Sequence, residues 1–345
     1  MKQVVFLILA FTFGNLAMFA GPEKLEQIAS FKGQQVTGVT VTQEGRIFVN
    51  FPRWRKSVEN SVLEVREDGS SQPYPNKEWN NWKTGKPVPD SMFVAVQSVV
   101  AVNDKLYVLD TCNPLWKGVI NNPRIFVFDL KTDELSDVLI LSDDSFKPNT
   151  YTNDLRIDTK NGFIYITDSN EPGLIVYDLE KKTSRRALDN HYSTRGEFNS
   201  LTINGRKWGG NKVHSDGIAF HLNNDRLYYH ALTGYTLYSV SAEALRDGTK
   251  TEIEQSVIRE AKTPAPDGMI FDQRGNLYMA DLENTAVIVL KPNGKTQTMA
   301  QGDQVGWADT FSIYDGYLYF TDSKIHLAGK GAEKLNYTIN RICIK

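Results

Sequence analysis

Aspartate is the chemically active residue that recurs most regularly along this chain. A short unit repeats six times, and acidic or amide residues flank it. The units start at Thr37, Gln97, Asn153-Asp154, Asp216, Asp267 and Asp309, and they end at Asn50, Asp110, Asp168, Ala231, Asp281 and Asp322. Gathered carboxylates repel one another unless backbone amides, protonation or a bound cation compensates them. Such an all-oxygen ligand set suits calcium or magnesium rather than zinc.

The start and end residues have different expected roles. The end residue is aspartate in four of the six units, which favours a structural role in which the carboxylate accepts backbone N–H bonds. The starting residues vary more, so they are the better candidates for a binding or metal site.

Histidine offers few candidate bases. His214 lies two residues before Asp216, and His230 lies near the end of a unit. A lone histidine is more often packed or solvated, so the functional reading of both competes with a structural one. The order and spacing show no Ser-His-Asp arrangement, no phosphate-binding glycine loop and no Cys/His zinc cluster.

The repeat that carries these residues predicts the fold. Each unit reads as an apolar strand, a turn and an aromatic-rich strand, and the six span 38–50, 98–110, 154–168, 216–231, 267–281 and 309–322. Turn pairs such as Asn161-Gly162 and Asp315-Gly316 favour hairpins, and a third strand often follows. This pattern predicts an all-β, six-bladed β-propeller. A long β-sandwich, the alternative, would not explain the regular doublet.

Strand direction predicts where the aspartates gather. The first strand of each blade lines the axis and the second returns, so the start and end residues should meet at one mouth. The last unit lacks a fourth strand, and we predict that residues 25–31 supply it and close the ring. One helical turn is expected at 242–246. Residues 68–90 and 189–213 are expected to be loops over one mouth.

Composition and the amino terminus limit the class of protein. With 39 Lys+Arg, 41 Asp+Glu and a formal charge of −2, the 345-residue chain lacks the positive field that nucleic-acid binding needs. Lys2, an apolar stretch over 4–13 and small residues to Gly21 predict a signal peptide at 1–20, with a membrane anchor as the alternative. A single domain should then cover 21–345. The mature protein is expected to be secreted or periplasmic, with no membrane partner.

Two cysteines, Cys112 and Cys343, are far apart in sequence. An oxidising compartment permits a disulfide between them, and geometry decides whether they can pair. The sequence leaves this question open, as it leaves the oligomeric state.

Long strings in the second and third units carry a resemblance. MFVAVQSVVAVNDKLYVLDT, PRIFVFDLKTDEL and YTNDLRIDTKNGFIYITDSN, with YPNKEWN upstream, look like the yellow/major royal jelly protein family. The resemblance covers about 74–322 and implies a secreted six-bladed propeller. Insect members are linked to melanin-pathway chemistry, nutrition and binding of biogenic amines.

A more distant resemblance bears on chemistry. HSDGIAFHLNNDRLYY and APDGMIFDQRGNLYMAD are similar to segments of the gluconolactonase/senescence-marker/luciferin-regenerating family, in which the residue before Gly binds a divalent cation. The resemblance implies Asp216 and Asp267 as ligands and Asn153 as a substrate contact. The first unit departs from that pattern, because Thr37-Gly38 stands where the family has a glutamate; Asp154 or Asp309 could substitute.

Two hypotheses from different classes follow. In the first, Asp216, Asp267 and Asp154 hold a divalent cation, which the resemblance implies is calcium, for a lactonase-like hydrolase. Asn153, Gln97 and Trp116 would then bind the substrate, and Asp267 or His214 would relay a proton. In the second, the chain is a non-catalytic binder whose loop residues Trp79, Trp82, Trp116 and Trp208 stack on a small aromatic or amine ligand. A tautomerase acting on oxidised catechols is a third, weaker hypothesis.

We expect the exported protein to begin between residues 18 and 22. Cleavage between Ala17 and Gly21 should remove the apolar segment. Intact mass spectrometry of protein recovered outside the cytoplasm checks this. A full-length chain that stays with the membrane fraction would favour the anchor instead.

Overall fold

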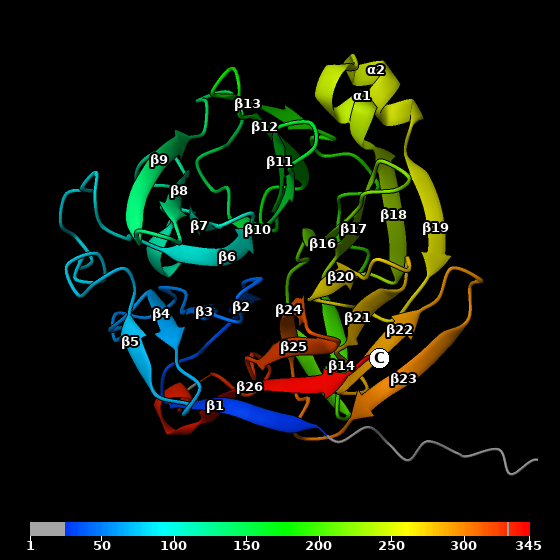
Figure 1. Ribbon diagram of the computed structural model, residues 1–345. Helices are drawn as coiled ribbons and strands as arrows, with labels where there is room; N and C mark the ends of the chain where they lie inside the picture. The colour runs from blue at the N-terminus through cyan, green and yellow to red at the C-terminus, as the bar shows by residue number, and fades with distance from the viewer. Residues whose placement is uncertain (1–24, 330) are drawn as a thin grey trace, which may run out of the picture.

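The computed structural model describes residues 25–329 and 331–345, and six four-stranded antiparallel sheets surround a central axis in it (Figure 1). The predicted six-bladed β-propeller is confirmed. Blades one to three comprise β2 (Gly38–Val41), β3 (Ile47–Asn50), β4 (Val62–Val65) and β5 (Ser71–Pro73); β6 (Val96–Val102), β7 (Lys105–Asp110), β8 (Arg124–Asp129) and β9 (Glu134–Ile140); β10 (Thr152–Asp158), β11 (Phe163–Asp168), β12 (Gly173–Asp178) and β13 (Thr183–Ala187).

The second half of the ring has the same plan. Its blades comprise β16 (Ser215–His221), β17 (Arg226–Ala231), β18 (Thr236–Ser241) and β19 (Ile258–Lys262); β20 (Met269–Phe271), β21 (Leu277–Asp281), β22 (Ala286–Leu290) and β23 (Thr296–Gln301); β24 (Ala308–Tyr314), β25 (Tyr317–Asp322), β26 (Asn336–Cys343) and β1 (Glu26–Lys32). The first strands β2, β6, β10, β16, β20 and β24 contact one another in a closed ring around the axis.

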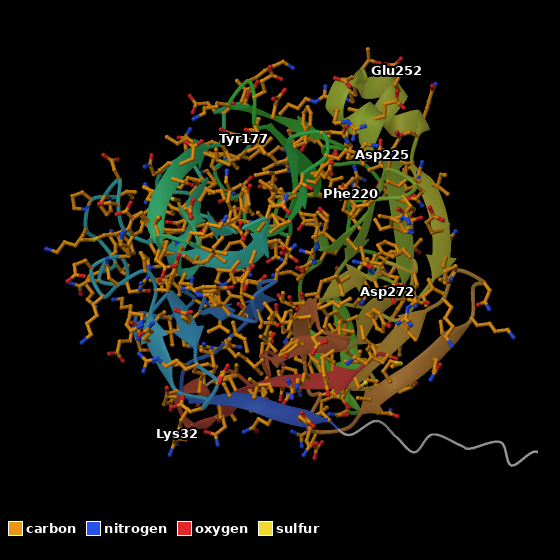
Figure 2. All side chains as sticks on the ribbon, in the orientation of Figure 1. Lys32, Tyr177, Phe220, Asp225, Glu252 and Asp272 are labelled. Carbon is orange, nitrogen blue, oxygen red and sulfur yellow. The ribbon has the colours of Figure 1, made fainter. Side chains whose placement is uncertain are left out.

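The core lies between the blades. Side chains fill the spaces that the ribbons leave, as Figure 2 shows. The aromatic residue of the second strand is buried in five blades, at Phe48, Tyr107, Tyr165, Tyr278 and Tyr319. Alternate residues of a strand face opposite sides of its sheet, so each blade presents apolar side chains to both neighbours. A single blade would leave these faces exposed, and the ring therefore folds as one unit.

The chain closes the ring as predicted. β1 pairs antiparallel with β26, with Phe31 opposite Tyr337 and Glu26 opposite Arg341. An ion pair between the Arg341 guanidinium and the Glu26 carboxylate supports the same pairing, at 2.9 Å. The first and last described strands thus share one blade, and unfolding of that blade opens the whole ring.

Three segments differ from the sequence prediction. Residues 68–90 are not all loop, because β5 (Ser71–Pro73) pairs with β4 as the outer strand of blade one. The expected helical turn is α1 (Ala242–Asp247), and a second helix, α2 (Lys250–Gln255), follows it with a capping box at Thr249. Residues 189–213 are not all loop, because β14 (Ser200–Ile203) and β15 (Arg206–Gly209) form a hairpin. The Asn204-Gly205 turn has positive φ at both residues, the combination that a two-residue hairpin turn requires.

Three further sequence predictions concern the signal peptide, membrane-spanning segments and the disulfide. The proposed signal peptide lies outside the described residues. Within the described part of the chain, no helix is long and apolar enough to cross a membrane. Cys112 is buried, Cys343 is partly exposed, and both are free thiols, so the disulfide that the sequence left open is not formed.

We predict that Phe31→Ala lowers the free energy of unfolding by about 3 kcal/mol, the usual cost of a buried Phe→Ala change. Phe31 is 8% exposed and packs edge-to-face on Phe51 with centroids 5.1 Å apart, so its loss weakens the closing strand. Urea denaturation checks this. Ile258→Ala, on the outer strand of blade four and 46% exposed, is the control and should change stability by less than about 0.5 kcal/mol. Equal effects would argue against closure by β1.

Candidate functional site

Four of the aspartates that start the blades converge on the axis. Asp154, Asp216, Asp267 and Asp309 line one cavity of about 10 Å³, together with Gln97, Ser98, Asn153 and Thr310. That volume admits about one water-sized atom. Blade one contributes none of the lining residues, since Thr37 is buried and its hydroxyl accepts from Asn50. The structure therefore brings together the predicted residues Asn153, Gln97, Asp154, Asp216 and Asp267.

Irregular strand starts turn these side chains toward the axis. The pairing register shifts near the starts of β6, β10, β16 and β24, at the positions that hold Gln97, Asn153-Asp154, Asp216 and Asp309. A β-bulge of this kind redirects a side chain and is common beside functional sites.

Glycine after the aspartate lets neighbouring inner strands approach. A Cβ at Gly217 would lie 2.6 Å from the Asp267 carbonyl oxygen, and one at Gly268 would lie 2.7 Å from the Asp309 carbonyl oxygen. Any larger residue would push the inner strands apart. The Asp-Gly pairs therefore fix both the positions of the carboxylates and the spacing of the inner strands around the axis.

The aspartates that end the second strands have the structural role predicted for them. Asp110 accepts from the backbone N–H groups of Val94 and Ala95, at 2.8 Å each, and Asp322 accepts from that of Trp307. Asp168 and Asp281 likewise accept backbone N–H bonds. None of the four lines the axial cavity. The single acidic mouth expected from the sequence thus separates into structural carboxylates and a smaller set at the axis.

Three axial carboxyls lack a cationic partner. Burial raises the pKa of Asp216 and Asp309 well above its usual value, and the charge of Asp267 raises both further. Burial raises the pKa of Asp267 to about 7, although the Trp307 indole N–H donates to it at 2.5 Å. Among the described residues, no ion pair includes any of these three carboxylates. Asp154 differs, because Arg156 pairs with it at 2.9 Å.

A chain of hydrogen bonds runs from the cavity to an aromatic surface. The Asn153 amide donates to Asp216 at 2.6 Å, and the Gln97 amide donates to the Asn153 oxygen at 2.9 Å. Gln97 accepts from the Tyr151 hydroxyl at 2.7 Å, which in turn accepts from the Trp54 indole. This relay fixes the orientation of both amides at the cavity.

Trp116 lies at the outer end of that relay rather than in the cavity. Its ring stacks on Tyr151 with centroids 3.7 Å apart and is 49% exposed. Leu115 and Trp116 both have positive φ, a strained conformation for such residues. The other candidate tryptophans pack elsewhere: Trp79 on Phe93, Trp82 in a buried cluster and Trp208 on Trp307.

Neither candidate histidine lines the cavity. Nδ1 of His214 accepts from the Gly196 backbone N–H at 3.0 Å, which ties the ring to the 189–213 segment. His230 is fully buried, contacts Thr263, and has its pKa lowered to about 4 by burial. A proton relay through His214 therefore receives no support from these contacts.

The donor set suits a hard cation. Asp216 and Asp267 are neighbouring buried carboxyls, and the remaining polar lining atoms are oxygens or amides. In the described part of the chain, however, no group of three or more His, Cys, Asp or Glu side chains is gathered closely enough to hold a metal ion. A cation here would rest on the two carboxylates, with neutral oxygens such as that of Asn153 completing its shell.

Sequence reasoning missed three residues that shape the site. Tyr151 and Trp307 stand two residues before Asn153 and Asp309, and Ser98 donates to Asp154 at 2.6 Å. Strand periodicity gave no reliable signal, because the pairing register shifts at the starts of β6, β10 and β24. Trp54 gave no signal either, since it comes from a loop of blade one.

Fold and cavity together define a six-bladed β-propeller with a cluster of carboxylates on its axis. The sequence model of the family described as major royal jelly protein matches residues 94–336, so this chain belongs to that family. Protein yellow of Drosophila yakuba is 30% identical over 267 residues, 69% of this chain and 48% of the relative, and that of Drosophila erecta is 29% identical over 230 residues, 60% and 41%. The chain spans about half the length of these curated relatives or less.

Solved structures share the fold at low sequence identity. A gluconolactonase from Xanthomonas campestris has a TM-score of 0.58 at 14% identity, covering 94% of this chain and 90% of that one. A luciferin-regenerating enzyme has a TM-score of 0.56 at 12% identity, covering 93% and 95%. The TM-scores show a shared propeller fold, and at these sequence identities the similarity shows the fold alone.

We predict that, in the presence of a chelator, the free energy of unfolding falls as the pH rises from about 4 to 7. Asp267→Asn should reduce this fall by a few kcal/mol. The raised pKa means that the folded state holds the Asp267 proton more tightly than the unfolded chain, whose aspartates titrate near 4. The contribution of the Asp267 proton to stability is therefore fully present below about pH 4 and is lost as the pH rises through 7. Urea denaturation at several pH values measures the difference between variant and wild type. If the stability of the variant and of the wild type changes with pH in parallel, the raised pKa of Asp267 is contradicted.

Proposed function

We propose that this protein is a secreted hydrolase of small cyclic esters that acts at the axial cavity with a divalent cation, calcium being the natural choice for oxygen ligands. One observation carries the proposal: Asp216 and Asp267 are adjacent, buried and without a cationic partner among the described residues. Sharing a proton or binding a cation is what relieves such a pair. The resemblance to a gluconolactonase in fold is consistent with this reading.

The residues that line the axial cavity have separate roles in this proposal. Asp216 and Asp267 would hold the cation, and Asp154, already paired with Arg156, would add negative charge beside them. The bound cation supplies Lewis-acid polarisation of a carbonyl. Asn153 and Gln97, fixed by their hydrogen bonds, would orient the substrate in the mouth above the cavity.

A proton acceptor is also available. Without a cation, burial raises the pKa of Asp267 to about 7; a bound cation would lower this pKa, so Asp267 would then be ionised and able to accept a proton. The Trp307 indole holds one of its oxygens at 2.5 Å and so fixes which oxygen faces the cavity. We assign proton transfer to Asp267 rather than to His214.

One observation favours a second function, binding of a small aromatic amine without turnover. Trp116 is half exposed and stacked on Tyr151, at the outer end of the relay that reaches Asp216. An ammonium group could pair with the axial carboxylates while the ligand's ring stacks on Trp116, and this aromatic contact would add about 0.5–1.5 kcal/mol. The absence of three gathered metal-binding side chains in the described residues is consistent with this alternative.

We expect the purified mature protein to contain a divalent cation and to hydrolyse a member of a lactone panel. A chelator should abolish turnover, and Asp216→Asn and Asp267→Asn should each lower kcat/KM by about 100-fold or more, the order of losing one catalytic electrostatic contact. Metal analysis and pH-stat assays measure these effects.

Asp281→Asn is the matched control. Asp281 is also a buried aspartate at this mouth, but its carboxylate accepts from Asn284 and does not line the cavity. Its kcat/KM per folded molecule should stay within about twofold of wild type. If the protein contains no metal, hydrolyses no lactone and binds an aromatic amine through Trp116, the hydrolase proposal is wrong and the binding function is favoured.

A further inference from the structure

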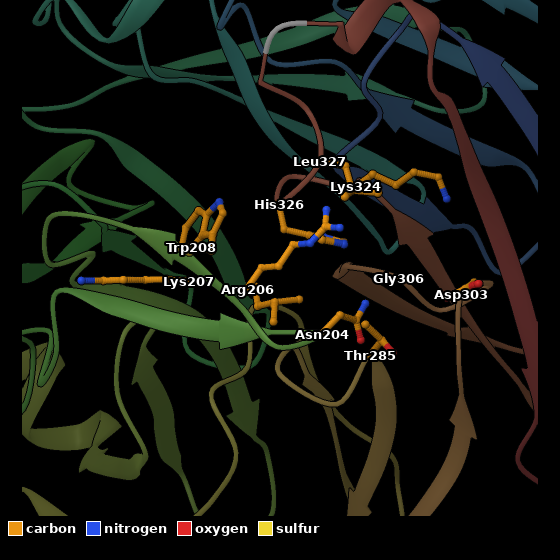
Figure 3. A pocket seen from close by; sticks show the side chains of 11 residues that line it. Asn204, Arg206, Lys207, Trp208, Thr285, Asp303, Gly306, Lys324, His326 and Leu327 are labelled. Carbon is orange, nitrogen blue, oxygen red and sulfur yellow. The ribbon is translucent and has the colours of Figure 1, made fainter.

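A second cavity, of about 500 Å³, opens on the same side of the ring as the acidic cavity. Hairpin β14–β15 forms one wall, and the segment after β25 forms the opposite wall (Figure 3). We name it the side pocket and define it by Arg206, Trp208, Asp303, Lys324 and His326. Its size is typical of small-molecule sites.

Charge distinguishes the side pocket from the axial cavity. Arg206 and Lys324 line it, Lys207 only borders it with a side chain that extends away, and Asp303 is its one carboxylate. Lys324 is already paired with the buried Asp322. Among the ion pairs of the described residues, none includes Arg206 or Lys207, so their charges remain uncompensated. An anionic ligand suits such a lining.

The hairpin directs only one of its two cations into the pocket. Cross-strand pairs share a face, and the register pairs Leu201 with Trp208, Ile203 with Arg206 and Thr202 with Lys207. Leu201 and Ile203 are buried against blades five and six, so Arg206 and Trp208 face the body of the protein. Figure 3 shows Arg206 reaching toward His326, whereas Lys207 extends away.

His326 offers an unsatisfied atom at the opposite wall. Its Nδ1 is buried and has no hydrogen-bond partner among the described residues, while its ring stacks on Trp307 with centroids 5.9 Å apart. Burial and the nearby Lys324 lower its pKa, so the ring is neutral at neutral pH. Because Nδ1 is enclosed, a ligand would meet the ring at Nε2, which has no hydrogen-bond partner among the described residues and can donate to an anion as Nε2–H.

The aromatic wall adds an apolar contact. Trp208 is partly exposed and packs edge-to-face on Trp307, with centroids 4.7 Å apart. An apolar or aromatic body can lie against its open face. Cationic, hydrogen-bonding and apolar elements thus meet within one cavity.

We propose that the side pocket binds a small organic anion, whose carboxylate or phosphate lies between Arg206 and His326 and whose apolar body lies against Trp208. The proposal is independent of the hydrolase, because neither Arg206 nor His326 lines the axial cavity. Anion binding in the side pocket and hydrolysis at the axial cavity can therefore be tested separately.

Calorimetry on the mature protein tests the proposal with benzoate, phenyl phosphate and uncharged benzyl alcohol as probes. We expect at least one anion to bind and the alcohol not to. Arg206→Gln should weaken binding about tenfold or more, and His326→Phe, which keeps a ring on Trp307, should weaken it as well. Phenyl phosphate binding tighter than benzoate would identify a phosphate ligand, and the reverse a carboxylate.

Lys207→Gln is the matched control, since it removes the same charge from the adjacent residue on the outer face. It should change the Kd by less than about twofold at 0.15 M salt, where diffuse attraction is screened. The proposal fails if neither anion binds, if both glutamine variants weaken binding equally, or if the alcohol binds as well as the anions. It also fails if Asp267→Asn abolishes binding while Arg206→Gln leaves it unchanged.

Discussion

The constraint on which the rest depends is the burial of carboxylates around a narrow axis. Asp216, Asp267 and Asp309 come from three successive blades and meet with no cationic side chain paired to them in the described structure. A charge there is costly unless a proton, a donor or a cation accompanies it. The closed ring keeps the three blades in contact and so maintains this unfavourable grouping.

The same constraint explains the local irregularities of the inner strands. Shifts of register turn the side chains inward, and Gly217 and Gly268 allow the next strand to approach within contact of their backbone. A regular strand would send alternate residues toward a neighbouring blade, where they would join the core. The inner strands therefore give up regular pairing at the positions that line the cavity. The aspartates that end the second strands, such as Asp110, stabilise the fold through backbone hydrogen bonds.

Trp307 links the two cavities. Its indole N–H holds Asp267 at the axis, and its ring supports both His326 and Trp208 in the side pocket. The acidic and basic cavities therefore share one rigid aromatic support.

The sequence by itself determined the blades, their number, the closing strand and the residues that begin each inner strand. These features follow from short-range patterns: strand periodicity, hairpin turns and a repeat. Even the overlooked hairpin was marked by Asn204-Gly205. Only the tertiary structure decided that Asp154 pairs with Arg156 whereas Asp216 and Asp267 remain unpaired, and that His214 lies away from the cavity. These outcomes depend on contacts between blades and on local bulges, which spacing along one chain does not encode.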